Sequence, residues 1–395
     1  MHAHAVWTED ATSLEAGRRL GDALAKGVPD LKVAVVYATV HHDLAALLEG
    51  VTSQVPAGVT VCGCSSQGVV SRNYFKEDGF LAGAMGLGGP TLSAMATMHT
   101  EIQLGTVEKA RAMAQALAAA PGGPPKVVVL YYDPLSRVDV PALLEGFRQV
   151  LPNAVLVGGG AGQPWGPMVQ TYQLLGTTVS SGACVALGLS GPFEAMTARS
   201  SGAESTGISM TITRTEGNHL LEIDGQPALD VWLEMVGRDR ATNNVDDTAA
   251  WSVGVRTGAD APLEGEEPWT IMAAFGFDPA RRSVILQGSV PQGAQVLFHH
   301  RTVGAVAEGT QAMATRMRER LTGRRPIAVL TFECGARVGP FLGETESRLE
   351  NKRLQETMAP DAAWLGMLAW GEIAPSPTTP AFCNYTFPLL VLTEP

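Results

Sequence analysis

The sequence predicts an α/β protein with pseudo-repeated strand–helix–strand units in its N-terminal half and a mixed α+β C-terminal half with antiparallel hairpins. Two observations support this fold class. A pattern of an apolar strand, an amphipathic helix and a second strand that ends in glycines recurs along the chain. Between the copies, short apolar stretches are broken by Gly, Pro and Asn. Continuous apolar strands joined through amphipathic helices favour parallel pairing, with helices covering the sheet.

The first two copies match closely. Apolar runs of strand length occupy residues 32–37 and 126–131, and a helical segment and a second strand follow each of them. The five residues Ala46–Gly50 recur letter for letter as Ala142–Gly146. Two further positions correspond at the same offset, namely Pro56 with Pro152 and Gly63 with Gly159. We interpret this self-similarity as an internal repeat.

A fainter third copy is expected near the C-terminal end. Residues 327–332 form its strand, residues 348–358 are helical, and Trp364 precedes a segment in which Gly366 and Gly371 have the spacing of Gly63 and Gly68. In open α/β sheets ligands bind beyond the carboxyl ends of the strands, where such glycine-rich turns lie. We therefore expect the turns of successive copies to meet in a shared polar pocket.

The region between the second and third copies predicts antiparallel strands. Residues 208–215 and 219–223 flank a turn that contains Gly217, and residues 269–277 and 283–288 flank Asp278-Pro279. A helix from about Val303 to Leu321, closed by Gly323, leads back to the third copy. We expect two domains, residues 1–205 and 206–395.

Composition limits the classes of partner. The 395 residues are 45% hydrophobic, and the formal net charge is −11. This charge disfavours nucleic acid and anionic membranes, because phosphate binding needs clustered Lys and Arg. The N-terminus has no basic region followed by an apolar core, and no run of eighteen apolar residues occurs. Five scattered cysteines, an odd number, fit reduced thiols, and we expect a cytoplasmic protein.

The third copy holds the best candidates for ligand contacts. Arg337 offers a planar fork of donors that suits a carboxylate. Glu372 could receive an ammonium group, and Asn384 could supply an amide. Together they suit an amino-acid-like ligand. The alternative is structural, since an Arg337–Glu372 ion pair would lock two loops, and the two interpretations are compatible.

The cysteines and serines have a catalytic interpretation beside a structural one. Cys334 precedes Arg337 by three residues, and a nearby cation can lower the pKa of a thiol, although a buried core cysteine is the commoner case. Ser65 and Ser66 are bounded by Gly63 and Gly68, but Gln67 replaces the second glycine of a nucleophile elbow, which favours a hydrogen-bonding loop.

Metal and nucleotide sites have little support. Cys62 and Cys64 are expected to face opposite sides of a strand end, and the second cysteine pair of a structural zinc site is missing. Residues 158–163 do not match the dinucleotide-binding glycine pattern. Gly159, Gly160 and Ala161 are therefore expected to allow close backbone approach, either to a ligand or to a neighbouring strand.

Haem is the one cofactor for which candidates exist. A non-covalent site needs one histidine that faces an apolar pocket. His99 follows an apolar segment, and a solvated or core histidine is the alternative there. The paired histidines follow or end strands and are expected at the surface. The candidate axial ligands are His41, His42, His99, His219, His299 and His300.

These segments, taken in order, resemble the FIST family. The matching residues are Val61–Gly68, Val157–Gly162, Gly217-Asn218, Ile223–Leu229, Val290–Gly293, Phe332–Arg337, Gly371–Ile373 and Asn384–Thr386. The resemblance covers roughly residues 30–392. It departs from the family at Cys383, where a histidine is expected before Asn384, and this weakens any role that depends on that imidazole.

The resemblance implies a bacterial sensory module of a signal-transduction system, without catalytic activity. The family is thought to bind small ligands, with amino acids proposed, and some members are similar to haem-dependent nitric oxide sensors. No effector domain is recognised in the chain, so a separate kinase or cyclase is the expected partner. The candidate ligand-binding residues are Cys64, Ser65, Ser66, Gly159, Gly160, Ala161, Cys334, Arg337, Glu372 and Asn384.

Overall fold

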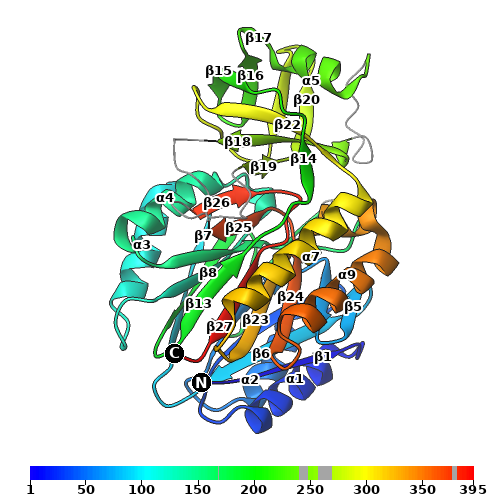
Figure 1. The fold of residues 1–395 in the computed structure, drawn as a ribbon. Coiled ribbons are helices and arrows are strands. Elements are labelled where there is room, and N and C mark those ends of the chain that lie inside the picture. The colour runs from blue at the N-terminus through cyan, green and yellow to red at the C-terminus, as the bar shows by residue number, and fades with distance from the viewer. Residues whose placement is uncertain (168, 240–247, 257–268, 376–379) are drawn as a thin grey trace.

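A computed structural model describes the chain except for residues 168, 240–247, 257–268 and 376–379. Within the described residues, the strands form three six-stranded sheets and one nine-stranded sheet. The three six-stranded sheets form the body of the molecule, and the nine-stranded sheet lies at the end opposite both termini (Figure 1). The chain is an α/β protein, as the sequence predicts.

The body consists of three structural repeats with one order of elements. Each repeat runs strand, helix, strand, helix, strand, short hairpin, strand. The first comprises β1 (His2–Thr8), α1 (Ser13–Gly27), β2 (Leu31–Ala38), α2 (Leu44–Gln54), β3 (Thr60–Ser65), β4 (Gly68–Ser71), β5 (Tyr74–Glu77) and β6 (Ala82–Gly88). The second comprises β7 (Ser93–Thr100), α3 (Thr106–Ala118), β8 (Val127–Tyr132), α4 (Val140–Val150), β9 (Val155–Gly160), β10 (Gln173–Leu175), β11 (Thr178–Ser180) and β12 (Ala183–Ser190).

The third repeat has the same order, with a long insertion after its first strand. It comprises β13 (Glu194–Ala198), α7 (Val303–Arg320), β23 (Pro326–Cys334), α9 (Gly343–Met358), β24 (Ala363–Ala369), β25 (Glu372–Pro375), β26 (Pro380–Cys383) and β27 (Leu389–Thr393). The central strand pair of every repeat is parallel, in the pairs β2–β3, β8–β9 and β23–β24. The three strand–helix–strand copies in the sequence are confirmed, including the faint third one.

The short hairpins are exchanged between the repeats. The hairpin β4–β5 of repeat one pairs with β24 of repeat three, and β10–β11 of repeat two pairs with β3 of repeat one. The hairpin β25–β26 of repeat three pairs with β9 of repeat two. Each sheet is therefore completed by a hairpin from another repeat, and the exchange closes into a ring.

The three sheets share one core. Side chains from all three central strand pairs face it, among them Tyr37, Tyr131 and Phe332 at corresponding positions. The outer face of each sheet is covered by a helix pair, α1 with α2, α3 with α4, and α7 with α9 (Figure 1). Local sequence determines where α2 begins. The Asp43 carboxylate caps the helix by accepting hydrogen bonds from the backbone N–H groups of Ala45 and Ala46.

The insertion in the third repeat is the nine-stranded sheet. Its strands are antiparallel and comprise β14 (Ala203–Ser205), β15 (Met210–Glu216), β16 (His219–Ile223), β17 (Gln226–Pro227), β18 (Trp251–Arg256), β19 (Thr270–Met272), β20 (Ala274–Asp278), β21 (Ser283–Leu286) and β22 (Gln295–Arg301). The helix α5 (Ala228–Val236) packs on it. The predicted hairpins β15–β16 and β20–β21 are confirmed. The predicted domain boundary at 205/206 falls inside this sheet, because β14 and β15 both pair with β22.

Candidate functional site

The glycine-containing segments that follow β3, β9 and β24 meet at one three-way junction. The Gly162 N–H donates to Ser65 O (2.9 Å), and the Gln67 N–H donates to Leu368 O (3.4 Å). Trp370 and Gly160 close the ring, because the N–H of Trp370 donates to Gly160 O at 3.0 Å. We call residues 65–68, 159–162 and 368–371 the three-turn junction. The structure brings the turns of the three copies together as backbone-to-backbone contacts.

Close backbone approach explains the glycines at this junction. A Cβ at Gly63 would lie 1.8 Å from Val36 O, and one at Gly158 would lie 2.0 Å from Leu130 O. Both glycines have positive φ, 155° and 146°. A Cβ at Gly160 would lie 2.3 Å from Trp370 O, and one at Gly159 would lie 2.7 Å from the Cβ of Ala369. The sequence leaves open whether these glycines allow close approach to a ligand or to a neighbouring strand. In the structure they allow close approach to neighbouring segments of the protein.

The serines of the junction make internal hydrogen bonds. Ser65 Oγ accepts from the Tyr172 N–H at 2.9 Å. Ser66 Oγ donates to Gly68 O at 2.5 Å and accepts from the Leu368 N–H at 2.9 Å. Both side chains are fully buried, and Ala161 is buried beside them. These residues hold the junction and line none of the cavities described below.

The cysteines of β3 belong to the shared core. Cys64 lies 3.7 Å from the sulfur of Met367, and burial raises its thiol pKa well above the usual value. The expectation that Cys62 and Cys64 face opposite sides is wrong, because residues two apart on a strand share a face and both side chains enter the same core. Among the described residues, no group of three or more His, Cys, Asp or Glu side chains is placed to hold a metal ion.

Arg337 is held in an ionic cluster within the third repeat. It ends the short helix α8 (Gly335–Arg337), is fully buried, and donates through Nη1 to Glu333 Oε1 at 2.8 Å and to Glu350 Oε2 at 2.6 Å. Nη2 donates to Glu350 Oε1 and to Thr310 Oγ1, both at 2.6 Å. Burial by itself lowers the pKa of Arg337, but the two carboxylates raise it above the usual value. The guanidinium pairs with Glu333 and Glu350 instead of Glu372.

Glu372 lies in a separate buried site at the start of β25. Its carboxylate accepts from the N–H of Gly371 (3.1 Å), and from both the N–H (3.1 Å) and hydroxyl (2.9 Å) of Thr386. The thiol of Cys334 donates to it as well. Burial raises the pKa of Glu372 to about 8, and these donors oppose the shift only in part. The structure therefore places Arg337 and Glu372 in different environments and not in one pocket.

A cavity of about 270 Å³ lies where the nine-stranded sheet meets the body. Cys334 and Asn384 line it, together with Ala336 and the Trp370–Gly371 end of the three-turn junction. Residues 273–276 line it too, and two of the aromatic residues that line it are exposed, Phe275 (54% exposed) and Trp165 (45%). Of the ten candidate residues, Cys334 and Asn384 line this cavity. Glu372 does not line it, but its carboxylate accepts a hydrogen bond from the Cys334 thiol.

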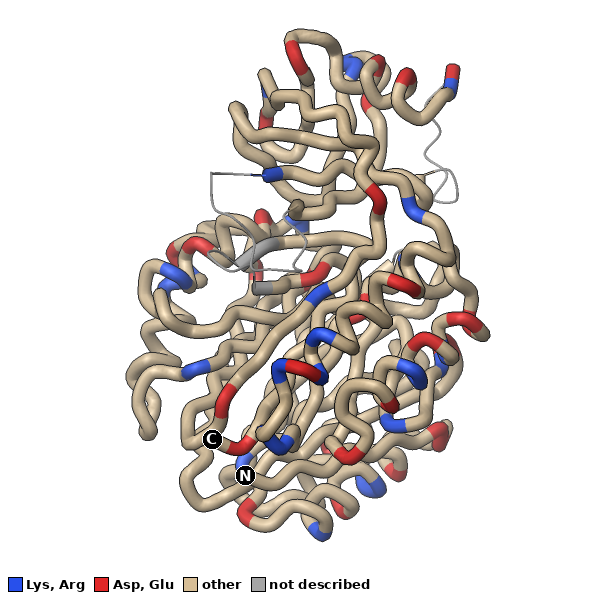
Figure 2. Tube along the Cα trace, viewed as in Figure 1, with Lys and Arg blue, Asp and Glu red and all other residues tan. Residues whose placement is uncertain are grey.

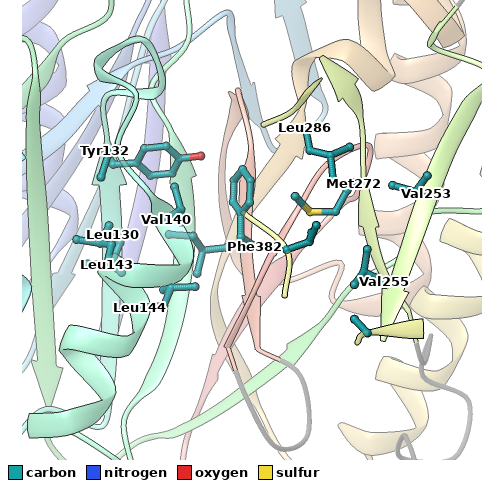
Figure 3. Close-up of a cluster of buried hydrophobic side chains, with 14 of the residues drawn as sticks. Leu130, Tyr132, Val140, Leu143, Leu144, Val253, Val255, Met272, Leu286 and Phe382 are labelled. Atoms are coloured by element: carbon teal, nitrogen blue, oxygen red, sulfur yellow. The ribbon is translucent and has the colours of Figure 1, made fainter. Parts of the chain in front are cut away.

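A larger cavity of about 600 Å³ adjoins the first and shares Pro134, Phe275 and Gln287 with it. Figure 3 shows part of its apolar wall, where the ring of Phe382 stands between Tyr132 on one side and Leu286 on the other. His219 also lines this cavity, and its Nδ1 lies 2.9 Å from the Ser283 hydroxyl. The other histidines considered for haem lie on strands or in the loop before α2. The expectation that the paired histidines lie at the surface is wrong for His42 and His299, which are buried.

Sequence reasoning missed several residues of the smaller cavity. The Gln287 amide connects the two sides, because its Oε1 accepts from Asn384 Nδ2 at 2.5 Å and its Nε2 donates to Trp370 O at 3.1 Å. Tyr385 lines the cavity with φ of 58°, a left-handed conformation that is uncommon for a residue with a side chain. Tyr385 lies in the segment Asn384–Thr386, which carries part of the family resemblance. Its position next to Asn384 is the one sequence feature that could have predicted a place in the cavity.

Charged residues of both signs are spread along the described part of the chain. Lys and Arg are interspersed with Asp and Glu over the tube in Figure 2. None of the helices in the described part of the chain is long and apolar enough to cross a membrane.

Comparison with known proteins identifies the family. The model of the FIST N domain matches residues 32–226, and the model of the FIST C domain matches residues 228–375. No curated protein resembles the chain significantly. The two matches together cover most of the chain, from the first repeat through the inserted sheet to β25. The chain belongs to the FIST family, whose domains are sensory modules of signal-transduction proteins.

Proposed function

We propose that this protein senses a small molecule that binds in the cavity between Trp370, Phe275 and Asn384. The observation that carries the proposal is the composition of its walls. Cys334, Trp370 and Tyr385 come from the third repeat, Pro134 and Leu135 follow β8 of the second, and residues 273–276 belong to the inserted sheet. A ligand there contacts three parts of the fold at once, so its binding changes how they are held together.

The walls favour a ligand with a flat, largely apolar body. The exposed rings of Phe275 and Trp165 line it, together with the buried rings of Trp370 and Tyr385. The side-chain amides of Asn384 and Gln287 supply the polar contacts. Each amide nitrogen makes one hydrogen bond within the protein, which leaves its second N–H for a ligand acceptor. Neither Arg337 nor Glu372 lines the cavity, so an amino-acid-like ligand cannot rely on them for its charges.

The proposed output is a change in the contact surface offered to a separate partner. We place the protein in the cytoplasm, with a kinase or a cyclase as the partner. Support comes from the family, whose domains are sensory modules of signal-transduction proteins.

The test combines native mass spectrometry of freshly purified protein with a metabolite panel, amino acids included, in a thermal-shift assay. A true ligand raises the melting temperature by mass action. Ala336 lines the cavity and is half-buried, so Ala336→Phe should fill the space and abolish the shift. Ala112→Phe, on an exposed position of α3, is the matched control. A shift that survives Ala336→Phe would place the ligand elsewhere.

The alternative of a haem-based gas sensor depends on the larger cavity. His219 lines it beside apolar residues, and the Ser283 contact at Nδ1 leaves Nε2 to hold an iron. Haem bound there would supply the gas-binding iron, and Arg137 at the same cavity could face a propionate. Absorption spectra of protein incubated with haem test this: a Soret band lost in His219→Ala supports it, and protein that takes up no haem excludes it.

The alternative of a thiol- or serine-dependent enzyme has less support. Burial raises the pKa of the Cys334 thiol well above its usual value, which disfavours the nucleophilic thiolate. The Ser66 hydroxyl donates to a backbone carbonyl, and none of the described residues supplies a base that is hydrogen-bonded to it. Stoichiometric labelling by an electrophile together with turnover would be required to establish catalysis.

A further inference from the structure

A buried arginine behind the smaller cavity has no acidic partner among the residues that the structure describes. Arg301 ends β22 and is 1% exposed. Its guanidinium carbon lies 4.2 Å from the ring centroids of both Phe341 and Tyr385, so the charged group is stacked between two aromatic faces. Nη1 donates to Ala249 O at 2.6 Å. These three contacts fix the plane and the direction of the guanidinium.

The remaining edge of this guanidinium is unsatisfied. Nε and Nη2 are buried and have no hydrogen-bond partner. These two nitrogens lie on the same edge of the group, and their parallel N–H bonds match the two oxygens of a carboxylate. Buried polar groups in native proteins are almost always satisfied, so a free pair requires an explanation such as a ligand or an ordered water.

The charge on Arg301 is retained. Burial lowers its pKa, but only to about 10, so the group stays protonated at neutral pH. The nearby Glu372 carboxyl has a pKa raised to about 8 by its burial and is largely protonated at pH 7. The guanidinium therefore presents a positive charge that no ionised side chain in the described part of the chain neutralises within ion-pair distance.

Three neighbours of this guanidinium line the cavity. Tyr385, whose ring covers the guanidinium, lines the cavity, as does Thr248, which adjoins the Ala249 carbonyl that binds Nη1. Cys334 lines the cavity too and interacts electrostatically with Arg301. Arg301 itself does not line the cavity, so a ligand reaches the guanidinium only when one of these neighbours, the strained Tyr385, moves aside.

We propose that Arg301 is the anion-binding residue of this sensor, and that the ligand entering from the cavity is a carboxylate whose two oxygens bind Nε and Nη2 once the Tyr385 side chain has moved aside. The proposal rests on the proposed sensing function and names the chemical class of its ligand: an apolar, flat acid. It also assigns roles to the neighbours, because the ring of Phe341 holds the guanidinium in place while the amides of Asn384 and Gln287 contact the rest of the ligand.

The experiment uses matched acids and amides. Calorimetric titration of the full-length protein with benzoate, benzamide, indole-3-acetate and indole-3-acetamide compares ligands that differ only in the carboxylate. We expect at least one acid to bind tenfold or more tightly than its amide. In Arg301→Met, which keeps a flexible apolar stem between the two rings, and in Arg301→Lys, which keeps the charge without the two-pronged edge, this preference should disappear. Arg18→Gln, an exposed arginine of α1, should retain it.

The outcomes separate this inference from the sensing function. Melting curves first establish that both Arg301 variants fold, and the lysine variant remains if the methionine one does not. If an acid and its amide bind equally and Ala336→Phe blocks both, the cavity is a ligand site but Arg301 does not select the ligand. If the preference for acids survives in the Arg301 variants, the anion is bound elsewhere and the inference is overturned. If neither acid binds wild-type protein, Arg301 holds only water and the inference also fails.

Discussion

Arg337 and Glu350 form a buried two-pronged ion pair, with Nη1–Oε2 and Nη2–Oε1 both at 2.6 Å. Glu350 reaches this position from α9, whereas Arg337 follows β23, so the pair joins the helix to the end of the central strand of the third repeat. Removing one partner of such a pair leaves a buried charge without compensation.

Glu350→Gln should therefore lower the free energy of unfolding by about 3–5 kcal/mol. Denaturant titration measures the change. Glu346→Gln, an exposed position one turn earlier on α9, should change the same quantity by no more than about 0.5 kcal/mol. Equal, small effects of the two variants would show that Arg337 is satisfied without Glu350.

The hydroxyls of Tyr37 and Tyr131 hydrogen-bond at 2.9 Å in the shared core, where the corresponding residue of repeat three is Phe332. Either single Tyr→Phe variant leaves one buried hydroxyl without its partner and should cost about 1–2 kcal/mol. The double variant should cost less than the sum, with a coupling of roughly 1 kcal/mol in a double-mutant cycle. Tyr172→Phe, half-buried outside this core, is the control; strict additivity would mean that the two hydroxyls do not depend on each other.

Gly63 and Gly158 have no room for a side chain. Gly63→Ala and Gly158→Ala combine a backbone conformation that L residues rarely adopt with a clash against a backbone carbonyl. Each should lower stability by about 3 kcal/mol. Gly304→Ala, in the first turn of α7 with open space around it, should be neutral or slightly stabilising. Thermal unfolding of the three variants measures this, and an unchanged Gly63→Ala protein would contradict the close approach.

Glu372 makes stability depend on pH. Its folded-state pKa of about 8 lies above the unfolded-state value of 4.5, so the folded protein binds a proton that the unfolded chain releases between these values. The contribution of Glu372 to the free energy of unfolding is therefore greatest below pH 4.5. It falls by about 1.4 kcal/mol per pH unit as the pH rises towards 8. Glu372→Gln should flatten the loss between pH 5.5 and 8.5.

Unfolding free energies at several pH values test this, with Glu49→Gln at an exposed position as the control. Glu333, whose pKa burial also raises, remains in the variant, so part of the slope should persist. A slope identical to that of wild type would show that Glu372 is already ionised in the folded protein at low pH.

The local architecture could be predicted from sequence, because hydrophobic periodicity and glycine spacing specify strands and helices. The exchange of hairpins could not. In β4, Val70 pairs with Gly366 of the third repeat, and nothing in a four-residue strand specifies which distant sheet edge it joins. The register depends on the shape of the complete body.

The candidate site was predicted in part for a related reason. Cys334 and Asn384 line the cavity, but Arg337 was assigned by residue type alone. Once α8 and α9 pack together, Glu333 and Glu350 both bind the guanidinium, and Glu372 does not. Arg301 was missed because it ends an apolar strand, where a charged residue resembles the polar boundary of the strand, and only burial distinguishes the two cases.

The ring of exchanged hairpins has a consequence for cooperativity. A solitary copy of the repeat would leave one edge of its second parallel strand unpaired and its hairpin without a sheet to join, whereas here β3, β9 and β24 each pair with the hairpin of another repeat. Unfolding of any one repeat would unpair strands in the other two, so the body should unfold as a single unit. The inserted sheet follows β13, an edge strand of its sheet, and so extends the chain without interrupting the exchange.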